Sequence, residues 1–228
     1  AKFSSFPIED FSFNWYFELF KDSVFHESLV ASLTVGIIAV VGTFLLAMPS
    51  SFVFVRKNFF LKKFFLIISL SPLYIPGIII GISWIAGMGI MKISPGIPIV
   101  SAAHVLFCIP FFILIMRSRL MNFDISVEEA GRDLGSNSKR VLRTITFPII
   151  LPSIIGACIL VFAVSLDEFI ITNFVIGGNS TIPTYIWGMM RYGLTPTANS
   201  LSSIMIFISV LLVVLSTIIM KKNNKNLF

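Results

Sequence analysis

The chain has 228 residues, of which 56% are hydrophobic and 12% are charged, and its formal net charge is +6. An ordinary soluble domain is about 45–50% apolar and about 25% charged, so this excess of apolar side chains excludes a single soluble core and places most of the chain in lipid. The positive charge does not indicate nucleic-acid binding, because the basic residues fall in short gaps between apolar runs, where membrane orientation accounts for them.

The first predicted element is the aromatic stretch at about 11–25, FSFNWYFELFKDSVF. Trp15 and Tyr16 are typical of the aromatic belt at a membrane–water interface, which favours a helix lying on the outer surface. An ordinary extracellular loop is the alternative. The chain starts at Ala1, and its first residues have neither the charged n-region nor the apolar h-region of a signal peptide.

Five later runs are long and apolar enough to cross about 30 Å of hydrocarbon as helices. They lie at roughly 28–55, 64–91, 97–116, 149–176 and 201–220. Barrel strands are excluded, because they have about ten residues of alternating polarity. Backbone groups in lipid must be hydrogen-bonded within their own segment, so each run is predicted to be a helix. Pro72 and Pro76 predict a bend or an unwound turn in the second run.

Most of the 17 basic residues lie in three segments: between the first and second runs, between the third and fourth, and after the fifth. The positive-inside rule places these three segments and the C-terminus in the cytoplasm and the N-terminus outside. An outside N-terminus without a signal predicts a further membrane helix before Ala1. An N-terminal tail that crosses the membrane unaided is the alternative.

The longest interior segment, residues 125–154, predicts a helix, a sharp turn and a second helix at the membrane surface. One small apolar face recurs at helical spacing in its first half, formed by Val127, Ala130 and Leu134. Gly135 follows at the position where a left-handed residue ends a helix at least cost, and Ser136 or Asn137 can cap the next helix. The shape predicts a docking knob, with a surface-lying linker helix as the alternative.

This segment resembles the signature loop of the permease subunits of ABC importers, whose pattern is E-A-A, three residues, G, nine residues, I, one residue, L-P. The matching positions are Glu129, Ala130, Gly135, Ile145 and Pro148. Gly131 replaces the second Ala, at a cost of up to about 1 kcal/mol in helix stability, and Phe147 replaces Leu. The stretches RLMNFDISVEEAGRDLGS, VSLDEFIITNFVIGG and IPTYIWGMMRYGLTPTANSLSSI are similar to the second permease subunit of spermidine/putrescine importers.

The resemblance implies an all-α membrane protein with the MetI-like transmembrane bundle of type I ABC importers. Five spans would be present and a sixth, the first, would be missing. Residues 1–228 would form a single permease domain with a cytoplasmic coupling loop at 117–147. The residues expected to couple to the ATPase are Glu129, Ala130, Gly131, Leu134, Gly135, Ile145 and Pro148. Four basic side chains would contact the ATPase or anionic lipid, namely Arg132, Lys139, Arg140 and Arg143.

The implied partners are a second permease subunit, identical or paralogous, a cytoplasmic ABC ATPase dimer, an external solute-binding protein and membrane lipid, in a bacterial inner membrane. The sequence has no GxxxxGK[ST] loop, so we expect no cofactor on this chain and expect the partner ATPase to use the ATP. Neither a metal site nor a catalytic site is predicted: His26–Glu27 lacks the second His of HExxH, and no GxSxG occurs. A channel or secondary transporter is the alternative, but no inverted repeat is evident.

The acidic pair Asp167–Glu168 lies well inside the fourth run. A charge near the bilayer centre costs at least about 2.5–3.5 kcal/mol, so the pair is expected to face a cavity or a partner. We expect both residues on the path of a cationic substrate, with a polyamine as the first candidate. An importer of another small solute, such as iron, thiamine or phosphonate, is the alternative that the resemblance leaves open. A structural pair bonded to Arg191 or to backbone is the other interpretation. His104 is expected to pack or hydrogen-bond rather than to relay protons.

Overall fold

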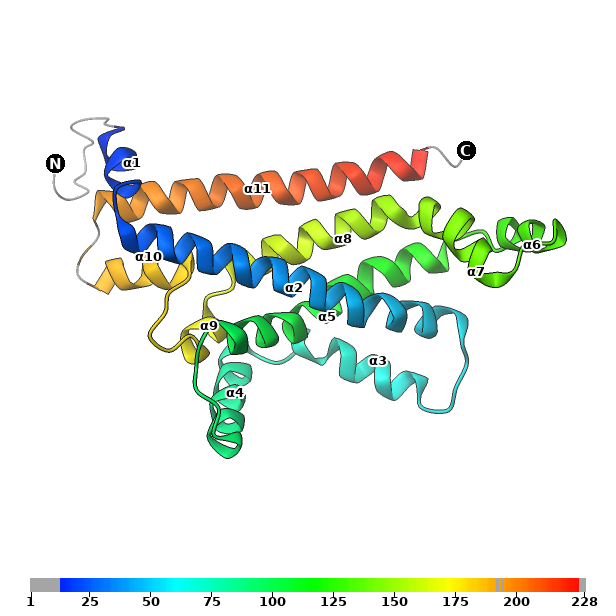
Figure 1. Ribbon diagram of the computed structural model, residues 1–228, viewed down its shortest axis with the longest axis horizontal. Coiled ribbons are helices and arrows are strands. Elements are labelled where there is room, and N and C mark those ends of the chain that lie inside the picture. Colours follow the sequence, from blue (N-terminus) through cyan, green and yellow to red (C-terminus); the bar gives the residue numbers. More distant parts are fainter. Residues whose placement is uncertain (1–12, 192, 194, 226–228) are drawn as a thin grey trace.

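A computed structural model describes residues 13–191, 193 and 195–225, and every regular element in that part of the chain is helical (Figure 1). The ends of the predicted domain, 1–12 and 226–228, lie outside the described residues, as does the helix predicted before Ala1. The elements are α1 (Asn14–Leu19), α2 (Ser23–Arg56), α3 (Lys62–Leu70), the 3-10 turn η1 (Ser71–Leu73), α4 (Gly77–Met91), α5 (Ile97–Met121), α6 (Ser126–Asp133), α7 (Ser138–Val141), the π-helical turn η2 (Leu142–Thr146), α8 (Phe147–Asp167), α9 (Ile170–Val175), α10 (Ile182–Arg191) and α11 (Pro196–Lys225).

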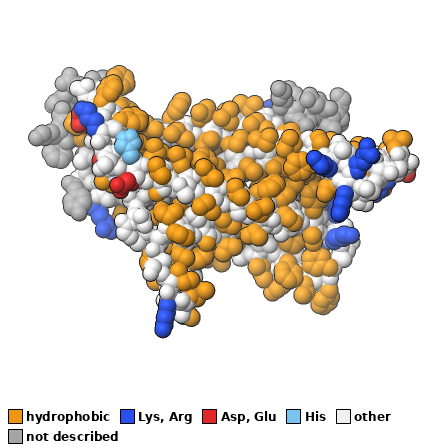
Figure 2. Space-filling model, viewed as in Figure 1, with side chains coloured by type: hydrophobic (Ala, Val, Ile, Leu, Met, Phe, Trp, Pro, Cys, Tyr) orange, Lys and Arg blue, Asp and Glu red, His pale blue; other side chains and the backbone are white. Residues whose placement is uncertain are grey.

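Four helical segments of the described chain are long and apolar enough to cross a membrane: α2, α5, the continuous stretch from α7 to the end of α8, and α11. A fifth span exists if α3 and α4 are counted as one broken helix. These helices run side by side along the longest axis, and orange apolar side chains cover their middle (Figures 1 and 2). The all-α membrane architecture expected from the sequence is therefore confirmed.

The second apolar run is sharply broken where the two prolines predicted a bend. The axes of Lys62–Leu73 and Gly77–Met91 differ by 104°, so α4 projects sideways from the bundle (Figure 1). Pro72 is the second residue of the short 3-10 turn, and Pro76 stands immediately before α4. Proline supplies no backbone N–H and disfavours helical geometry in the residue before it, so the helix stops and restarts in a new direction.

The two ends of the bundle differ in character. One end carries α6, α7 and the C-terminal end of α11, and the connection from α2 to α3 lies there as well (Figure 1). All three basic segments of the sequence thus share one end, as the charge pattern predicted, and blue side chains gather there in Figure 2. The other end carries α10 and α1, which lies across the end of α11 with Phe13 and Phe17 exposed. Its contact with lipid stays a prediction.

The main core lies where α2, α5 and α8 meet. Its fully buried members include Ala47, Cys108, Phe112, Met116 and Ala157, so Cys108 is an apolar packing residue, as expected. The backbones of α2 and α5 come close beside Gly42, where Thr43 Oγ1 donates to the carbonyl of Val105 at 3.1 Å. Small residues at such crossings allow membrane helices to approach closely.

The close approach of α2 and α5 gives a first prediction. A methyl group added at Gly42 would lie 2.5 Å from Val105 Cγ2, on a short branched side chain that cannot swing away. We expect Gly42→Ala to lower the free energy of unfolding by about 1–3 kcal/mol, the usual cost of overpacking. Denaturation of the purified protein in detergent measures it.

The matched control is Gly89→Ala in α4, where an added Cβ has no neighbour within 4 Å. This change should be neutral or slightly stabilising, because Ala is the better helix former. Equal stability of the two variants would show that the crossing tolerates a methyl group.

Candidate functional site

The predicted helix–turn–helix is present at the basic end of the bundle. Helix α6 ends at Asp133, and Gly135 adopts φ +83°, the left-handed conformation expected of the residue that ends this helix. Asn137 caps α7, since its Oδ1 accepts from the backbone N–H of Arg140 at 2.9 Å. Pro148 lies in the first turn of α8, and α7 runs through the π-helical turn directly into that span. Helix α5 continues to Met121, so the first residues of the predicted loop 117–147 belong to that helix.

A buried carboxylate fixes the helix–turn–helix of residues 126–146, called the knob below, to the bundle. Glu128 of α6 has a side chain only 2% exposed, and both of its oxygens accept hydrogen bonds from Arg56, the last residue of α2, at 2.7 and 2.6 Å. Thr146 Oγ1 donates to it at 2.5 Å and Arg132 Nη2 at 3.3 Å. One side chain therefore joins α2, α6 and the turn before α8.

The ionised state of Glu128 suits this role. Burial raises the pKa of the Glu128 carboxyl, but the hydrogen bonds from Arg56 and Thr146, with the charges of Arg56 and Arg132, outweigh burial and hold the pKa below its ordinary value of 4.5. Paired N–H donors from one guanidinium form the strongest class of protein ion pair. The rings of Phe52 and Phe123 flank the same guanidinium, with centroids 5.2 and 5.5 Å from its central carbon.

The residues chosen from the signature pattern divide into two groups. Glu129, Ala130 and Leu134 are exposed, and Leu134 is 88% exposed, so they form the open surface of the knob. Gly131 and Ile145 lie on its inner side, where a Cβ on Gly131 would lie 2.5 Å from Ile145 Cδ1. Alanine there would have to displace the end of the Ile145 side chain.

Sequence reasoning selected Glu129 and missed Glu128. Glu128 carries the same charge and precedes the pattern by one position, but its partner Arg56 lies 72 residues earlier in the chain. The only local signal was the spacing of Glu128 and Arg132, four residues apart, which suits a helical ion pair. No local pattern connects Glu128 with the end of α2.

The acidic pair of the fourth run is separated by a break in the helix. The prediction of one helix over 149–176 is wrong, because α8 ends at Asp167 and α9 begins at Ile170. Glu168 caps α9: its two oxygens accept from the backbone N–H groups of Ile171 at 2.8 Å and Thr172 at 2.9 Å. The carboxylate thus accepts hydrogen bonds from backbone N–H groups that lipid could not satisfy.

His104 completes a buried polar network around this break. Its Nδ1 lies 2.7 Å from Ser165 Oγ, its Nε2 lies 2.8 Å from Thr172 Oγ1, and the Nε2 is 3.5 Å from Glu168 Oε2. The side chains of His104 and Glu168 are 1% and 7% exposed. His104 is therefore a hydrogen-bonding residue, as expected, which ties α5 to both sides of the break.

Asp167 is placed differently from its neighbour. Its side chain is exposed and accepts a hydrogen bond from Ser209 Oγ of α11 at 2.9 Å. Within the described chain, neither Asp167 nor Glu168 forms an ion pair with Arg191. Glu168 does bond to backbone, so for this residue the backbone form of the structural alternative is observed. Of the two acids, Asp167 is the one accessible to a solute.

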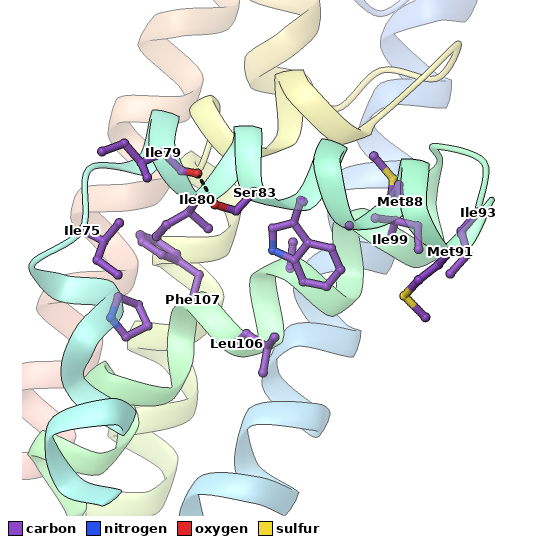
Figure 3. Close-up of a pocket in the computed structure, with 14 residues that line it drawn as sticks. Ile75, Ile79, Ile80, Ser83, Met88, Met91, Ile93, Ile99, Leu106 and Phe107 are labelled. Carbon is purple, nitrogen blue, oxygen red and sulfur yellow. Dashed lines mark hydrogen bonds between the residues drawn. The ribbon is translucent and has the colours of Figure 1, made fainter. Parts of the chain in front are cut away.

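A separate hollow of about 420 Å³ lies between α4 and α5 (Figure 3). Its walls are apolar, with Trp84, Met88 and Phe107 among them. The single hydroxyl that lines it, on Ser83, donates to the carbonyl of Ile79 at 2.8 Å within α4. The hollow offers no charge to a cationic solute. No group of three potential metal ligands occurs among the residues that the structure describes.

Comparison with known proteins agrees with this arrangement. The profile of a family described as "binding-protein-dependent transport system inner membrane component" matches residues 39–227. The spermidine/putrescine transport system permease protein PotC of Haemophilus influenzae is 33% identical over 94% of this chain and 84% of its own length. The putrescine transport system permease protein PotI of Escherichia coli K12 is 32% identical over 86% of this chain and 72% of its own length.

Two solved structures share the fold. A chain of the inward-facing MetNI methionine ABC transporter superposes with a TM-score of 0.71 at 16% identity, covering 93% of this chain and 99% of that one. A chain of a bacterial alginate ABC transporter, solved with an alginate-bound periplasmic protein, gives a TM-score of 0.67 at 15% identity, covering 92% and 81%.

The anchor of the knob gives the second prediction. Glu128→Ala leaves Arg56 and Thr146 without their shared acceptor. Breaking a fully buried pair costs about 3–5 kcal/mol, and the partial exposure of Arg56 places this case toward the lower end. Hydrogen exchange of residues 126–146 should accelerate. Glu129→Ala, one position along on the exposed face, is the control and should leave exchange unchanged.

The same measurement has a defined pH dependence. Because the pKa of Glu128 is lower in the folded state than in the unfolded chain, its stabilisation is complete above about pH 4.5 and is lost as the pH falls below that value. Exchange protection that does not change between pH 7 and about pH 4.5, declines as the pH falls from there to the folded-state pKa, and does not decline further below it fits this anchor. Equal protection of the Glu128→Ala variant and the unmodified protein would contradict it.

Proposed function

The chain belongs to the family of binding-protein-dependent transport system inner membrane components, and from this membership we propose that it helps to import a polyamine as one permease subunit of an ATP-driven transporter. The permease itself is non-catalytic. The proposed partners are a second permease subunit, a cytoplasmic ATPase dimer and an external solute-binding protein. The basic end of the bundle, with the C-terminus, would face the cytoplasm.

One observation carries the proposal that the knob couples the permease to an ATPase. Helix α6, which carries the exposed face, is bonded through buried Glu128 to Arg56 of α2 and to Thr146 just before α8. A force on α6 would therefore be transmitted to two spanning segments. Exposed apolar side chains suit a protein interface, and Val127 and Leu134 are of this kind. Ala130 and Glu129 would extend the contact, whereas Gly131, Gly135, Ile145 and Pro148 would give the knob its shape.

The polyamine part of the proposal is supported by two independent observations. The PotC and PotI relatives reported above are described as polyamine permeases. Independently, Asp167 presents an exposed carboxylate at the helix break between α8 and α9, where an ammonium group could replace the hydrogen bond from Ser209. Glu168 would act on the same path indirectly, because its carboxylate holds the start of α9 in position. Iron, thiamine and phosphonate are the alternatives that a transport assay would separate.

The third prediction concerns Gly135. Gly135→Pro fixes φ near −65° where the chain requires +83°, and it removes an N–H that donates to the carbonyl of Arg132 at 2.8 Å. The turn should lose at least about 1 kcal/mol of stability, and substrate-stimulated ATP hydrolysis should fall while membrane insertion persists. Gly135→Asn is the control, because Asn tolerates the left-handed conformation. Full stimulation in the proline variant would reject a role for this turn in coupling.

The fourth prediction concerns Asp167. Asp167→Asn keeps the shape and the hydrogen bond to Ser209 but removes the charge. Loss of one charge-assisted contact, worth about 1.5–3 kcal/mol, should reduce spermidine uptake by at least about tenfold. Uptake of a monovalent amine should suffer less, and assembly with the ATPase should not change.

The control is Glu18→Gln, which removes an exposed carboxylate of α1 that pairs only with Lys21 among the described residues. It should transport normally. If Asp167→Asn also transports spermidine normally at every concentration, Asp167 is structural and the polyamine assignment loses its support within this chain.

A further inference from the structure

The turn between α2 and α3, residues 57–61, has an unusual composition for an exposed segment. The backbone N–H of Lys62 donates to the carbonyl of Phe59 at 3.1 Å, so Phe60 and Leu61 occupy the two central positions of a tight turn. Such positions usually hold Gly, Pro, Asn, Asp or Ser. Here Phe60 is 99% exposed and Leu61 is 45% exposed. Two large apolar side chains are thus presented at the tip of the turn.

The neighbouring side chains hold this turn in shape and extend its apolar surface. The ring centroid of Phe65 lies 6.3 Å from that of Phe59 and 5.8 Å from that of Phe64. Lys62 Nζ donates to Asn58 Oδ1 at 3.3 Å across the turn. The three rings are all exposed, and α3 buries none of its residues. Residues 57–65, called the aromatic turn below, therefore form one continuous exposed surface.

The aromatic turn is positively charged and has no acidic residue near it in the sequence. It contains Lys57, Lys62 and Lys63, and the chain has no Asp or Glu between Glu27 and Asp124. No ion pair in the described part of the chain involves any of these three lysines. Blue side chains adjoin the orange surface at this edge of the molecule (Figure 2). The surface thus combines exposed aromatic rings with three cations.

Helix α6, at the same end of the bundle, differs in charge and in position. It carries Glu129 and Asp133 on its exposed surface, and it reaches farther along the long axis than the connection from α2 to α3 (Figure 1). The aromatic turn directly follows Arg56, where the apolar run of α2 ends, so a bilayer crossed by α2 would end near this turn. An anionic surface would attract the lysines of the aromatic turn and repel the carboxylates of α6.

We propose that the aromatic turn inserts into the headgroup layer of anionic phospholipids and fixes the start of α3 to the membrane surface. Phe60 and Leu61 lie below the phosphates, and Lys57, Lys62 and Lys63 contact them. Apolar rings beside basic residues suit this layer, because lysine stems lie along apolar surface while their ammonium groups reach the phosphates. The assignment to the inner leaflet rests on the proposed orientation, whereas the lipid class rests on the charge of the turn.

Spin labelling of the assembled transporter in lipid nanodiscs tests the position of the turn. Phe60→Cys is labelled in a protein that carries Cys108→Ala and Cys158→Ala, which remove the two native thiols. Collisions of the label with oxygen, which concentrates in lipid, are compared with collisions with a water-soluble nickel chelate. In nanodiscs that contain phosphatidylglycerol and phosphatidylcholine, the label should favour oxygen. Leu134→Cys, at an 88% exposed apolar position of α6, is the matched control and should collide with little oxygen.

The same label tests the lipid class. Lys57→Gln with Lys63→Gln should lower the ratio of lipid-embedded to water-exposed label at least about fivefold, the equivalent of roughly 1 kcal/mol for one lysine near an anionic surface. Lys21→Gln with Lys92→Gln removes the same charge from exposed sites elsewhere and should leave the ratio unchanged. If the charge variant does not insert, the protein with all its lysines is compared in nanodiscs of phosphatidylcholine alone, where the ratio should fall in the same direction.

Three results would overturn the proposal. A label at position 60 that favours the nickel chelate would place the turn in water. A label shielded from both reagents would show that a protein segment of the complex covers the turn. A ratio that is the same with and without phosphatidylglycerol would remove the preference for anionic lipid. Polyamine uptake and ATP hydrolysis do not enter these measurements, so their failure leaves the proposed transport function untouched.

Discussion

Glu128 is the residue through which the end of the bundle is held together. Its side chain is almost completely buried, and its two oxygens receive donors from α2, from α6 itself and from the turn that leads into α8. A buried carboxylate is tolerated only when its charge and its lone pairs are satisfied. The position and rotation of α6 are therefore fixed by a requirement for complete hydrogen bonding, and the exposed face that α6 presents follows from it.

Glu168 meets the same requirement inside the span. A helix that stops within an apolar layer leaves N–H groups that lipid cannot satisfy. Glu168 accepts two of them at the start of α9, and His104 and Ser165 complete the network from α5 and α8. Asp167 is the last residue of α8, and its exposed carboxylate accepts a hydrogen bond from Ser209 of α11. One carboxylate thus maintains the break, and its neighbour is free to meet a solute.

Two hollows show how the surrounding side chains decide what a space can bind. The hollow between α4 and α5 is larger than a single side chain, but its walls offer no charge and its one hydroxyl is used within α4. A second hollow, at the basic end between α5, α8 and α11, has a similar size and has Arg119 in its wall. Size alone does not distinguish the two hollows, whereas the charge of their walls does.

The sequence by itself determined the membrane class, the positions of the apolar runs, the bend at Pro72 and Pro76, and the turn at Gly135, because each depends on composition or on spacing within one segment. Only the tertiary structure decided that Glu128 is a buried anchor and that its neighbour Glu129 is exposed. It also decided that Glu168 caps a helix while Asp167 remains exposed. These outcomes depend on partners far along the chain: Arg56 is 72 residues from Glu128, and His104 is 61 from Ser165. Local periodicity carries no information about contacts at that separation, so only the packing of the helices could establish them.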